Sequence, residues 1–327
     1  MDQIIKEYLT SFEFRELQHF ENLGIIPLLT PLNKTPEYLT LKEALEKRIL
    51  AITEVSREGS VPELKVKNKA KKPVLLLDGE ELVGAKQNRV LNTTILLKEK
   101  SETVIPVSCT EQGRWSYKSK ELSDSGTVLT PKLRLIKAQT VSDSLEDSRE
   151  YRSDQGTVWE GIHDISEETG THSRTGAMRD VYEAKRSDLD AYLKAFTCVP
   201  HQKGLLIFIN GKIIGFDFVS LESAFKVLHP KLVKSYAMEA LIEKKEKPKK
   251  PKVKEAKSFI EEVAACEEKK YESVGKGWDY RFQGKDVVGS ALVFQKKVIH
   301  MAFFRITESE KTGPIAGYRR RKGFRTD

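Results

Sequence analysis

An asparagine–glycine pair between two apolar runs constrains the fold more than any other local feature of this chain. The runs cover residues 204–209 and 212–218, and Asn210 and Gly211 stand between them. Both residue types tolerate the positive φ angles of a two-residue type I′ turn, so the pattern predicts a β-hairpin. The chain must therefore contain antiparallel sheet, which excludes an all-helical fold.

Short β-like segments dominate residues 24–115. Clusters of Gly, Pro, Asn and Lys separate them, and no long helical pattern lies between them. The segments are 25–29, 49–55, 63–67, 74–77, 89–97 and 103–109. This spacing favours a small antiparallel sandwich or barrel-like sheet.

Helical periodicity, with apolar residues three or four positions apart, marks much of the remaining chain. These segments are 3–22, 41–48, 131–146, 156–168, 176–196 and 221–243, and residues 255–305 read as one more helix followed by antiparallel strands. We therefore predict an α+β fold, in which an antiparallel β-rich N-terminal half packs with a helical region and the hairpin. A small α+β C-terminal segment completes it.

The predicted boundaries follow these changes of pattern. A main domain covers residues 1–243, with a β-rich part (24–115), a helical part (129–196) and the hairpin with its helix (204–243). After it come a lysine–proline linker (244–254), the small segment of helix and antiparallel sheet (255–310) and a basic tail (311–327). The sequence leaves open whether the small segment docks on the main domain.

Composition bears on location and partners. The 327 residues contain no apolar run of about 18, which a membrane span requires, and the first residues lack the basic start of a secretory signal. Three well-separated cysteines suit a reducing compartment, so we expect a cytoplasmic protein. Much of the net charge of +8 lies in the linker and the tail. Tyr318 and Phe324 accompany the tail arginines, which makes nucleic acid a candidate partner beside the simpler interpretation of solvated charge.

The stretch from Asp78 to Trp115 is the densest in residues that carry chemistry. Polar side chains follow the ends of two apolar strands here, where loops commonly bind ligands. Three acids are candidates for acid–base or metal chemistry, and seven other residues are candidates for holding an anion or stacking on a ring. The acids are Glu80, Glu81 and Glu111; the others are Gln87, Asn88, Arg89, Asn92, Gln112, Arg114 and Trp115.

A structural interpretation competes with this one. Arg89 could form a buried ion pair with Glu80 or Glu81 that fixes sheet register, because an unpaired buried charge is costly. Trp115 could be a lid on the core, and Cys109 is more typical of a small core hydrophobe than of a nucleophile.

A second group of polar residues precedes a helical pattern at 176–196. Ser173, Arg174 and Thr175 combine hydroxyls, an arginine and flanking glycines, which suits a phosphate at a helix N-terminus. An ordinary capped turn explains the same residues. Metal ligation has weaker support: Cys198 and His201 lack a second pair at matching distance, and His163 and His172 lie across a turn from each other.

These motifs together resemble the family of ARG- and rhodanese-phosphatase-superfamily-associated protein domains. The segments that carry the resemblance are LDGEELVGAKQNR (77–89), PVSC (106–109), EQGRW (111–115), VW (158–159) and SRTGAM (173–178), within residues 15–243. The resemblance implies association with ADP-ribosylglycohydrolases and with NAD-derived nucleotides or ADP-ribose. It assigns no catalytic residues and no cofactor.

We therefore expect the chain to bind, and to be a candidate for processing, a phosphate-containing nucleotide such as an NAD- or ADP-ribose-derived metabolite. The alternative is a nucleic-acid-binding or protein-interaction module that uses the linker and the tail without catalysis. A scaffold whose polar clusters only hold the fold is a third hypothesis. The sequence identifies neither the reaction nor the oligomeric state.

Overall fold

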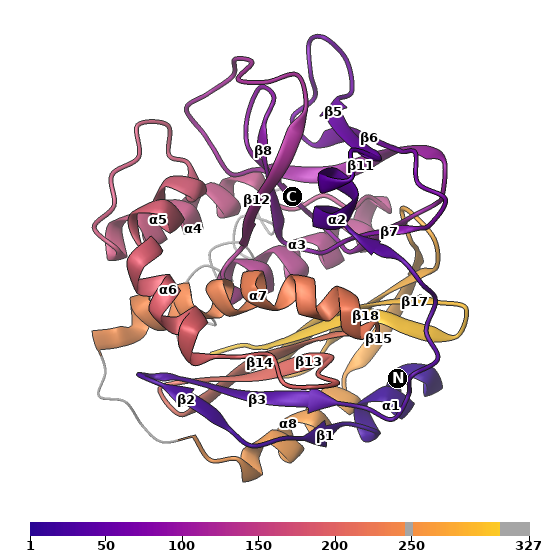
Figure 1. Cartoon of the computed structure of the whole chain (residues 1–327), viewed down its shortest axis with the longest axis vertical. Helices are drawn as coiled ribbons and strands as arrows, with labels where there is room; N and C mark the ends of the chain where they lie inside the picture. Colours follow the sequence, from indigo (N-terminus) through magenta and orange to yellow (C-terminus); the bar gives the residue numbers. More distant parts are fainter. Residues whose placement is uncertain (246–250, 308–327) are drawn as a thin grey trace.

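The predicted hairpin is present and lies inside a large antiparallel sheet (Figure 1). The computed structural model describes residues 1–245 and 251–307. Strand β13 (Gly204–Ile209) turns into β14 (Lys212–Val219), and φ is 50° at Asn210 and 76° at Gly211. These positive angles are what a type I′ turn requires.

The large sheet has nine strands in the order β1-β3-β13-β14-β18-β17-β16-β15, with β2 paired to β3. The first and last parts of the chain thus flank the hairpin. The remaining strands are β1 (Glu13–Phe14), β2 (Gln18–Phe20), β3 (Leu23–Leu29), β15 (Glu267–Glu272), β16 (Trp278–Gln283), β17 (Val287–Phe294) and β18 (Lys297–Arg305).

Both faces of this sheet are buried. Side chains alternate across a strand, so Leu206 and Phe208 of β13 point to one face and Leu205 and Ile207 to the other. The first face packs with α1 (Gln3–Thr10) and α8 (Lys254–Ala264) in one core. The second face packs with α3 (Pro131–Ser148) and α7 (Glu222–Ile242) in another. This double coverage explains why the hairpin runs are apolar throughout.

Two smaller sheets and the short helix α2 (Leu41–Glu46) surround a third core. In Figure 1 they lie on the far side of α3 and α7 from the large sheet. One sheet has the order β12-β8-β9-β11-β6-β5 and the other β10-β7-β4. Their strands are β4 (Leu39–Thr40), β5 (Leu50–Glu54), β6 (Glu63–Asn68), β7 (Val74–Leu76), β8 (Glu80–Gly84), β9 (Arg89–Leu91), β10 (Ile95–Leu97), β11 (Ser101–Cys109) and β12 (Leu122–Val128).

Three further helices lie to one side of α7: α4 (Gln155–Glu168), α5 (Met178–Ala184) and α6 (Arg186–Ala195) (Figure 1). Their apolar residues join the core formed by α3 and α7. A 3₁₀ turn, η1 (Glu243–Lys245), follows α7. Within the described residues, no helix is long and apolar enough to cross a membrane.

The predicted N-terminal helix over 3–22 is wrong beyond Thr10. Helix α1 ends there, and residues 13–20 form β1 and β2 instead. Both short strands pair with β3, with Phe14 opposite Leu28 and Gln18 opposite Ile25. Pairing with a buried strand satisfies the backbone of this segment, and this tertiary gain outweighs a local helical pattern.

Other boundaries differ for comparable reasons. The predicted strand 89–97 is two strands in different sheets, and the predicted helix 176–196 breaks at Lys185 into α5 and α6. The sequence analysis missed β8 and β12, which pair with each other. Strand β8 is fully buried although it begins with Glu80 and Glu81. It was not predicted because acidic residues are not typical of a buried strand.

The C-terminal segment is part of the main body. Strand β18 pairs with β14, placing Phe303 opposite Phe216, so 255–305 completes the large sheet and its helical cover. The α+β class with an antiparallel β-rich N-terminal half is confirmed. Linker residues 246–250 and residues 308–327, which include the basic tail, lie outside the described part of the chain.

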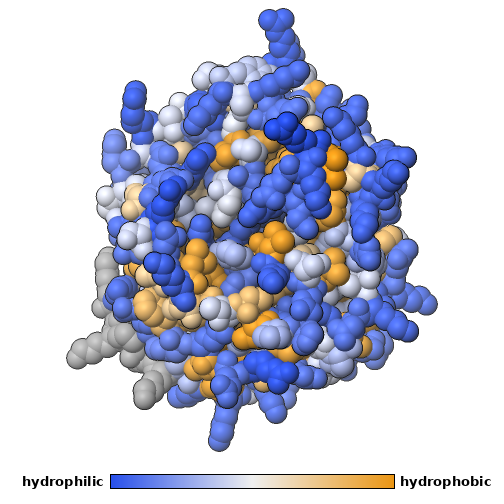
Figure 2. All heavy atoms as spheres, in the orientation of Figure 1, coloured by the Kyte–Doolittle hydropathy of each residue, from blue (hydrophilic) through white to orange (hydrophobic). Residues whose placement is uncertain are grey.

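Hydrophilic side chains cover most of the face drawn in Figure 2, and apolar atoms show between them across its middle, over α7. Among the described residues, the large hydrophobic side chains that are exposed include two near the predicted site, Trp115 and Tyr117. Since aromatic residues of this size are usually buried, their exposure marks this surface for closer attention.

Candidate functional site

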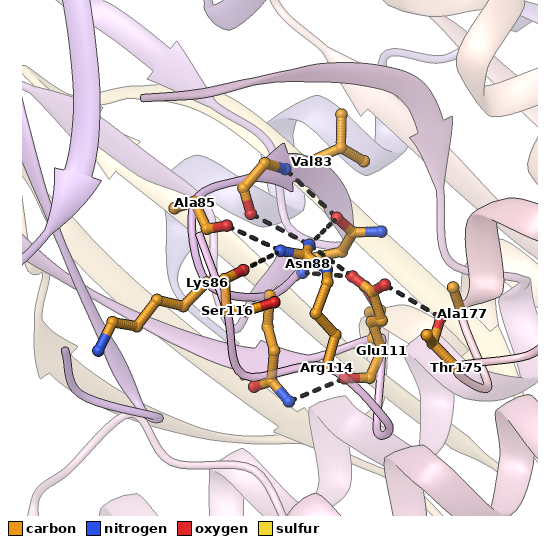
Figure 3. A network of polar contacts seen from close by, with 12 residues as sticks. Val83, Ala85, Lys86, Asn88, Glu111, Arg114, Ser116, Thr175 and Ala177 are labelled. Atoms are coloured by element: carbon orange, nitrogen blue, oxygen red, sulfur yellow. Dashed lines mark hydrogen bonds and ion pairs between the residues drawn. The ribbon is translucent and has the colours of Figure 1, made fainter. Parts of the chain in front are cut away.

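The two polar groups predicted from the sequence meet at Glu111 (Figure 3). One carboxylate oxygen of Glu111 accepts a hydrogen bond from the Thr175 hydroxyl at 3.0 Å. The other contacts Arg114 Nη2 at 2.6 Å and the Asn88 backbone N–H at 3.2 Å. Segments that are far apart in the sequence therefore share one polar network.

The backbone brings these segments together as well. Gly113 N–H donates to the Thr175 carbonyl at 2.8 Å, and Met178 N–H donates to the Thr110 carbonyl at 2.9 Å. A Cβ atom at Gly113 would lie 3.0 Å from the Thr175 Cα, which explains the glycine at this close approach.

Glu111 is ionised, and its hydrogen bonds hold the surrounding loop in place. Burial alone would raise the pKa of its carboxyl, but hydrogen bonds from Arg114 and Thr175 outweigh burial, and the pKa is lowered. With both oxygens bonded and the charge held, Glu111 suits the role of positioning its loop better than that of a general acid.

Arg114 holds the same loop. Its Nη1 donates to the carbonyls of Ala85 and Ser116, and its Nη2 donates to the Gly84 carbonyl, the Asn88 side chain and Glu111. Both terminal nitrogens of the guanidinium are therefore occupied by protein acceptors. This leaves no free fork of the kind that binds phosphate.

Arg89, unlike Arg114, has a terminal nitrogen without a hydrogen-bond partner. It is completely buried, and its Nη1 donates only to neutral acceptors, the Gln87 side chain at 3.1 Å and the Asn88 carbonyl at 3.4 Å. Its Nε and Nη2 have no hydrogen-bond partner, and no carboxylate of a described residue forms an ion pair with it. Burial lowers the pKa of Arg89, with partial compensation from charges that include Glu54. The predicted ion pair of Arg89 with Glu80 or Glu81 is not formed.

Trp115 covers Arg89 on the side of the solvent. The guanidinium carbon lies 5.5 Å from the centre of the indole ring, and Trp115 itself is 45% exposed. Lys86 Nζ lies 5.2 Å from the ring centres of both Trp115 and Tyr117. We call Arg89, Trp115, Tyr117 and Lys86 the Trp115 surface.

A broad pocket of about 590 Å³ adjoins the Trp115 surface at Tyr117. Its lining is basic, with Glu54 as the acidic member; it consists of Thr53, Glu54, Ser56, Arg57, Tyr117, Lys118, Ser119 and Lys120. One oxygen of Glu54 accepts from Lys86 N–H at 3.1 Å, and the other is buried without a partner. Glu54 and Lys86 were not among the site residues predicted from the sequence, although Lys86 lies in the motif at 77–89. The run from Trp115 to Lys120 was the signal that could have located this pocket.

At the predicted phosphate site, residues 173–175, the two hydroxyl groups contact acidic side chains of the protein. Ser173 donates to Asp180 at 2.5 Å and accepts from Ala177 N–H, while Thr175 donates to Glu111. Arg174 is exposed. Acidic partners on both hydroxyls disfavour an anion here, and the turn fits the interpretation of an ordinary helix start.

Gln112 and Ser173 line a separate pocket of about 430 Å³ beside α4, together with Trp159, His163 and His172. Both histidines predicted to lie across a turn thus face one cavity. Within the described residues, no group of three or more His, Cys, Asp or Glu side chains could hold a metal ion.

Gln87, Cys109 and Asn92 have internal partners. Gln87 accepts from the Cys109 thiol at 3.0 Å and donates to the Glu111 carbonyl, and burial raises the pKa of Cys109, which keeps the thiol protonated. Asn92 binds the Tyr151 carbonyl and the Ser108 hydroxyl. These polar groups are therefore engaged within the protein.

Glu80 and Glu81 differ although they are neighbours on β8. Glu80 contacts Lys231 at 2.6 Å, and Lys231 also contacts Asp124 at 2.7 Å. Glu81 is equally buried but forms no ion pair within the described part of the chain; its oxygens accept from Thr110 at 2.8 Å and Thr127 at 3.2 Å. Burial raises the pKa of Glu81 to about 7. Glu81 is thus the predicted acid whose protonation changes near neutral pH.

This difference predicts how stability depends on pH. Because the folded-state pKa of Glu81 exceeds its unfolded value of 4.5, the unfolded state gains by ionising as pH rises from about 4.5 to about 7. The wild-type protein should lose about 3 kcal/mol of stability over this interval relative to Glu81→Gln. Urea unfolding of both proteins at pH 5 and pH 8 measures the difference, with exposed Glu102→Gln as control. Parallel pH profiles of wild type and Glu81→Gln would contradict the burial of an uncompensated carboxyl.

The sequence analysis missed a set of buried charges between the large sheet and the smaller ones. Arg134 on α3 forms two hydrogen bonds with Asp217 on β14, at 2.8 and 2.6 Å, and Asp217 also accepts from the Tyr236 hydroxyl at 2.7 Å. Lys137 contacts Asp78, and Arg281 contacts Asp279 at 2.6 Å. Two of these pairs, Arg134 with Asp217 and Lys137 with Asp78, join distant parts of the chain, so no local pattern marks them.

One part of this set has the residue types of a hydrolytic triad. His300 lies 3.4 Å from Asp217 and 2.9 Å from the Thr94 hydroxyl. The Thr94 hydroxyl also accepts from Asp78 N–H, and Thr94, Asp217 and His300 are all buried. With the hydroxyl enclosed and fixed in this way, the arrangement serves the fold and not a substrate.

Comparison with protein families adds one positive finding. The family described as ARG and Rhodanese-Phosphatase-superfamily-associated Protein domain matches residues 11–304. The match extends past the limit of residue 243 drawn from the sequence, in agreement with the C-terminal strands being part of the large sheet. No curated protein and no solved structure gives a significant match.

Proposed function

The chain belongs to the family of ARG- and rhodanese-phosphatase-superfamily-associated protein domains, and we propose that it binds a phosphate-containing nucleotide at the Trp115 surface. The observation that carries the proposal is the Arg89 guanidinium, which is buried beneath an exposed indole with two nitrogens unpartnered. A buried cation without an ion-pair partner destabilises the fold, and an anionic ligand that contacts it would offset that cost.

The aromatic side chains indicate that the ligand also contains a planar ring. Trp115 is 45% exposed and Tyr117 51% exposed, and Lys86 lies over both rings. A planar base stacks favourably on such rings in a sequence-tolerant way. A ligand with both a ring and a negative charge therefore fits better than a simple anion.

The adjoining pocket extends the region of positive charge. Arg57, Lys118 and Lys120 line it, against the single carboxylate of Glu54. Its volume of about 590 Å³ lies within the range of small-molecule sites. Phosphates beyond the one at Arg89 would meet these side chains, which agrees with a dinucleotide or an ADP-ribose-like metabolite.

The proposal is limited to binding at this surface. Both oxygens of Glu111 are bonded and its charge is held, so no proton transfer is assigned to it. Arg114, Ser173 and Thr175 are given positioning roles, because both terminal nitrogens of Arg114 and both hydroxyls already contact protein groups.

Tryptophan fluorescence tests the proposal directly, because the chain has only three tryptophans. Titration with ADP-ribose, NAD or AMP should quench Trp115, and Trp115→Ala should weaken binding by about tenfold or more, as expected for loss of one stacking partner worth about 1–3 kcal/mol. Trp278→Ala is the matched control, since Trp278 is 47% exposed and is covered by Lys270 in a similar way. Calorimetry should give the same affinities. Absence of binding of all three nucleotides, with and without Mg²⁺, would rule the proposal out.

Nucleic-acid binding remains the alternative, through the linker and the tail. A single-stranded oligonucleotide should be included in the titrations, together with a chain truncated at Pro314. Retention of the oligonucleotide that falls steeply with salt and disappears on truncation would favour this alternative. Nucleotide binding that survives truncation would favour the Trp115 surface.

A further inference from the structure

A β-bulge in β12 directs two hydroxyl side chains toward the buried Glu81. In the pairing of β12 with β8, Asp124 lies opposite Leu82 and Val128 opposite Glu80, so residues 125–127 face a single residue of β8. Gly126, with φ of 78°, makes the irregular turn possible. Bulges re-aim side chains and are frequent beside active sites.

The two hydroxyls form a chain that ends on Glu81. Thr127 Oγ donates to Glu81 Oε2 at 3.2 Å, and Ser125 Oγ lies 2.6 Å from Thr127 Oγ. Because Thr127 uses its only hydrogen on Glu81, Ser125 must donate to Thr127. The backbone N–H of Thr127 donates to Ser125 Oγ at 3.1 Å and fixes its position. The hydrogen bonds thus run from Ser125 through Thr127 to Glu81.

This chain opens into a pocket of about 320 Å³. Ser125 and Thr127 line it together with residues of α5, α6 and α7. The Tyr182 hydroxyl in its wall donates to the Val128 carbonyl, and Arg186 is paired with Glu183. Lys234 and Asp190 supply the remaining charges of the lining. Two lining hydroxyls are thus linked to Glu81, which forms no ion pair within the described residues; of the two, Ser125 is less buried than Thr127.

We propose that this pocket is a second site, in which Ser125 attacks a small phosphoryl or acyl ester and Glu81 accepts the serine proton through Thr127. In this step the Ser125 Oγ bonds to phosphorus or to the acyl carbon, and the bond to the leaving group breaks. The hydroxyl proton of Ser125 passes to Thr127, and that of Thr127 passes to the Glu81 carboxylate. Lys234 is positioned to attract the negative oxygen of the ester.

The surroundings of Glu81 agree with a base that works near neutral pH. Thr110 at the end of β11 and Ser125 and Thr127 on β12 offer hydroxyls, while α5 contributes Arg179 and Tyr182. Burial outweighs all of these contacts and raises the pKa of Glu81 to about 7. A base with a pKa near the working pH combines adequate ionisation with adequate proton affinity.

A purely structural role would be met by the same hydrogen bonds, so the test must report on the reactivity of Ser125. The full chain is treated with a fluorophosphonate, whose phosphorus bonds to Ser125 Oγ as fluoride leaves. Mass spectrometry of the digested protein identifies the modified residue, and the rate of modification is followed from pH 5.5 to 8.5.

We expect modification of Ser125 at a rate that rises with pH and levels off above about pH 7. Glu81→Gln and Thr127→Val should each slow it at least tenfold, and Ser125→Ala should abolish it. Ser123→Ala is the matched control, because Ser123 lies on the same strand outside the bulge and its hydroxyl contacts the Val83 carbonyl. Its rate should equal that of the wild type.

Several results would overturn the proposal. These are an unmodified Ser125 in the wild-type protein, a rate that does not change with pH, or equal rates in wild type and folded Glu81→Gln. Hydrolysis of p-nitrophenyl phosphate and p-nitrophenyl acetate then separates phosphoryl from acyl substrates. Failure here leaves nucleotide binding at the Trp115 surface untouched, because the two sites share no lining residue.

Discussion

Arg89→Met is expected to weaken nucleotide binding by about 100-fold while leaving the free energy of unfolding unchanged or higher. Loss of the guanidinium removes charge-assisted hydrogen bonds to a phosphate, and about 3 kcal/mol corresponds to a factor of about 100 in affinity. The hydrogen bonds that the folded protein loses all go to neutral acceptors, and the contact with the Trp115 ring is lost with them, while Gln87 keeps its contact with Cys109. Removing a buried charge without an ion-pair partner offsets the lost hydrogen bonds.

Weaker nucleotide binding without a loss of stability would distinguish a ligand-binding arginine from a structural one. A structural arginine would behave in the opposite way, with stability falling by several kcal/mol and affinity unchanged once the protein is folded. Calorimetric titration with ADP-ribose and urea unfolding measure the two quantities. Arg174→Met, at an exposed arginine of the 173–175 turn, is the control and should change neither. A destabilised Arg89→Met protein with wild-type affinity would exclude Arg89 from the site.

Asp217→Asn is expected to lower the free energy of unfolding by about 3–5 kcal/mol, because it leaves Arg134 buried and unpaired. The side chains of Asp217 and Arg134 are fully buried and form two parallel hydrogen bonds. Burial opposes ionisation of Asp217, but the charge of Arg134 and its hydrogen bonds outweigh burial and hold the pKa well below its usual range. The amide retains the shape of the carboxylate but loses its charge and one acceptor oxygen, so the effect combines the ion pair with the hydrogen bonds made to that oxygen.

Chemical unfolding at pH 7 measures this loss. Glu46→Gln is the control, because its partner Lys42 lies on an exposed helix surface and such pairs contribute little. Replacing Arg134 and Asp217 together by apolar residues should restore part of the stability, since two buried charges then disappear at once. A stability close to wild type in Asp217→Asn would mean that water or other groups reach Arg134.

Much of the fold could be predicted from local sequence patterns. The Asn210-Gly211 turn, the boundaries of β17 and the long helices α3 and α7 could be predicted because apolar periodicity and turn residues act within a few positions. The segments that were missed or misassigned depend on distant partners. Residues 13–20 become strands only because β3 is available, and β8 is a strand although it starts with two glutamates.

In the candidate site, too, some features could be predicted from local sequence and others depend on residues distant in the chain. Glu111 and Thr175 were each predicted as site residues, but whether their two groups meet was left open by the sequence, and the structure supplied the contact. Arg89 could be singled out in the sequence as a charge on a buried strand, but its lack of an ion-pair partner depends on how distant segments fold around it. The exposed aromatics beside Lys118 and Lys120 were recognisable locally, whereas the bulge that turns Ser125 and Thr127 toward Glu81 depends on strand register.

The order of strands in the large sheet bears on how the chain is made. Strand β3 emerges from the ribosome early, yet its main partner β13 pairs Gly204 with Leu28, and β14 in turn awaits β18, which pairs Met301 with Phe218. Ile25 has an early sheet neighbour in Gln18, but Ile26 stays without its neighbour Leu206 until most of the chain has been synthesised. Sheets closed by such distant pairings form slowly and expose aggregation-prone edges meanwhile. The large sheet of this protein can therefore close only after β18, which lies between β14 and β17, has been synthesised.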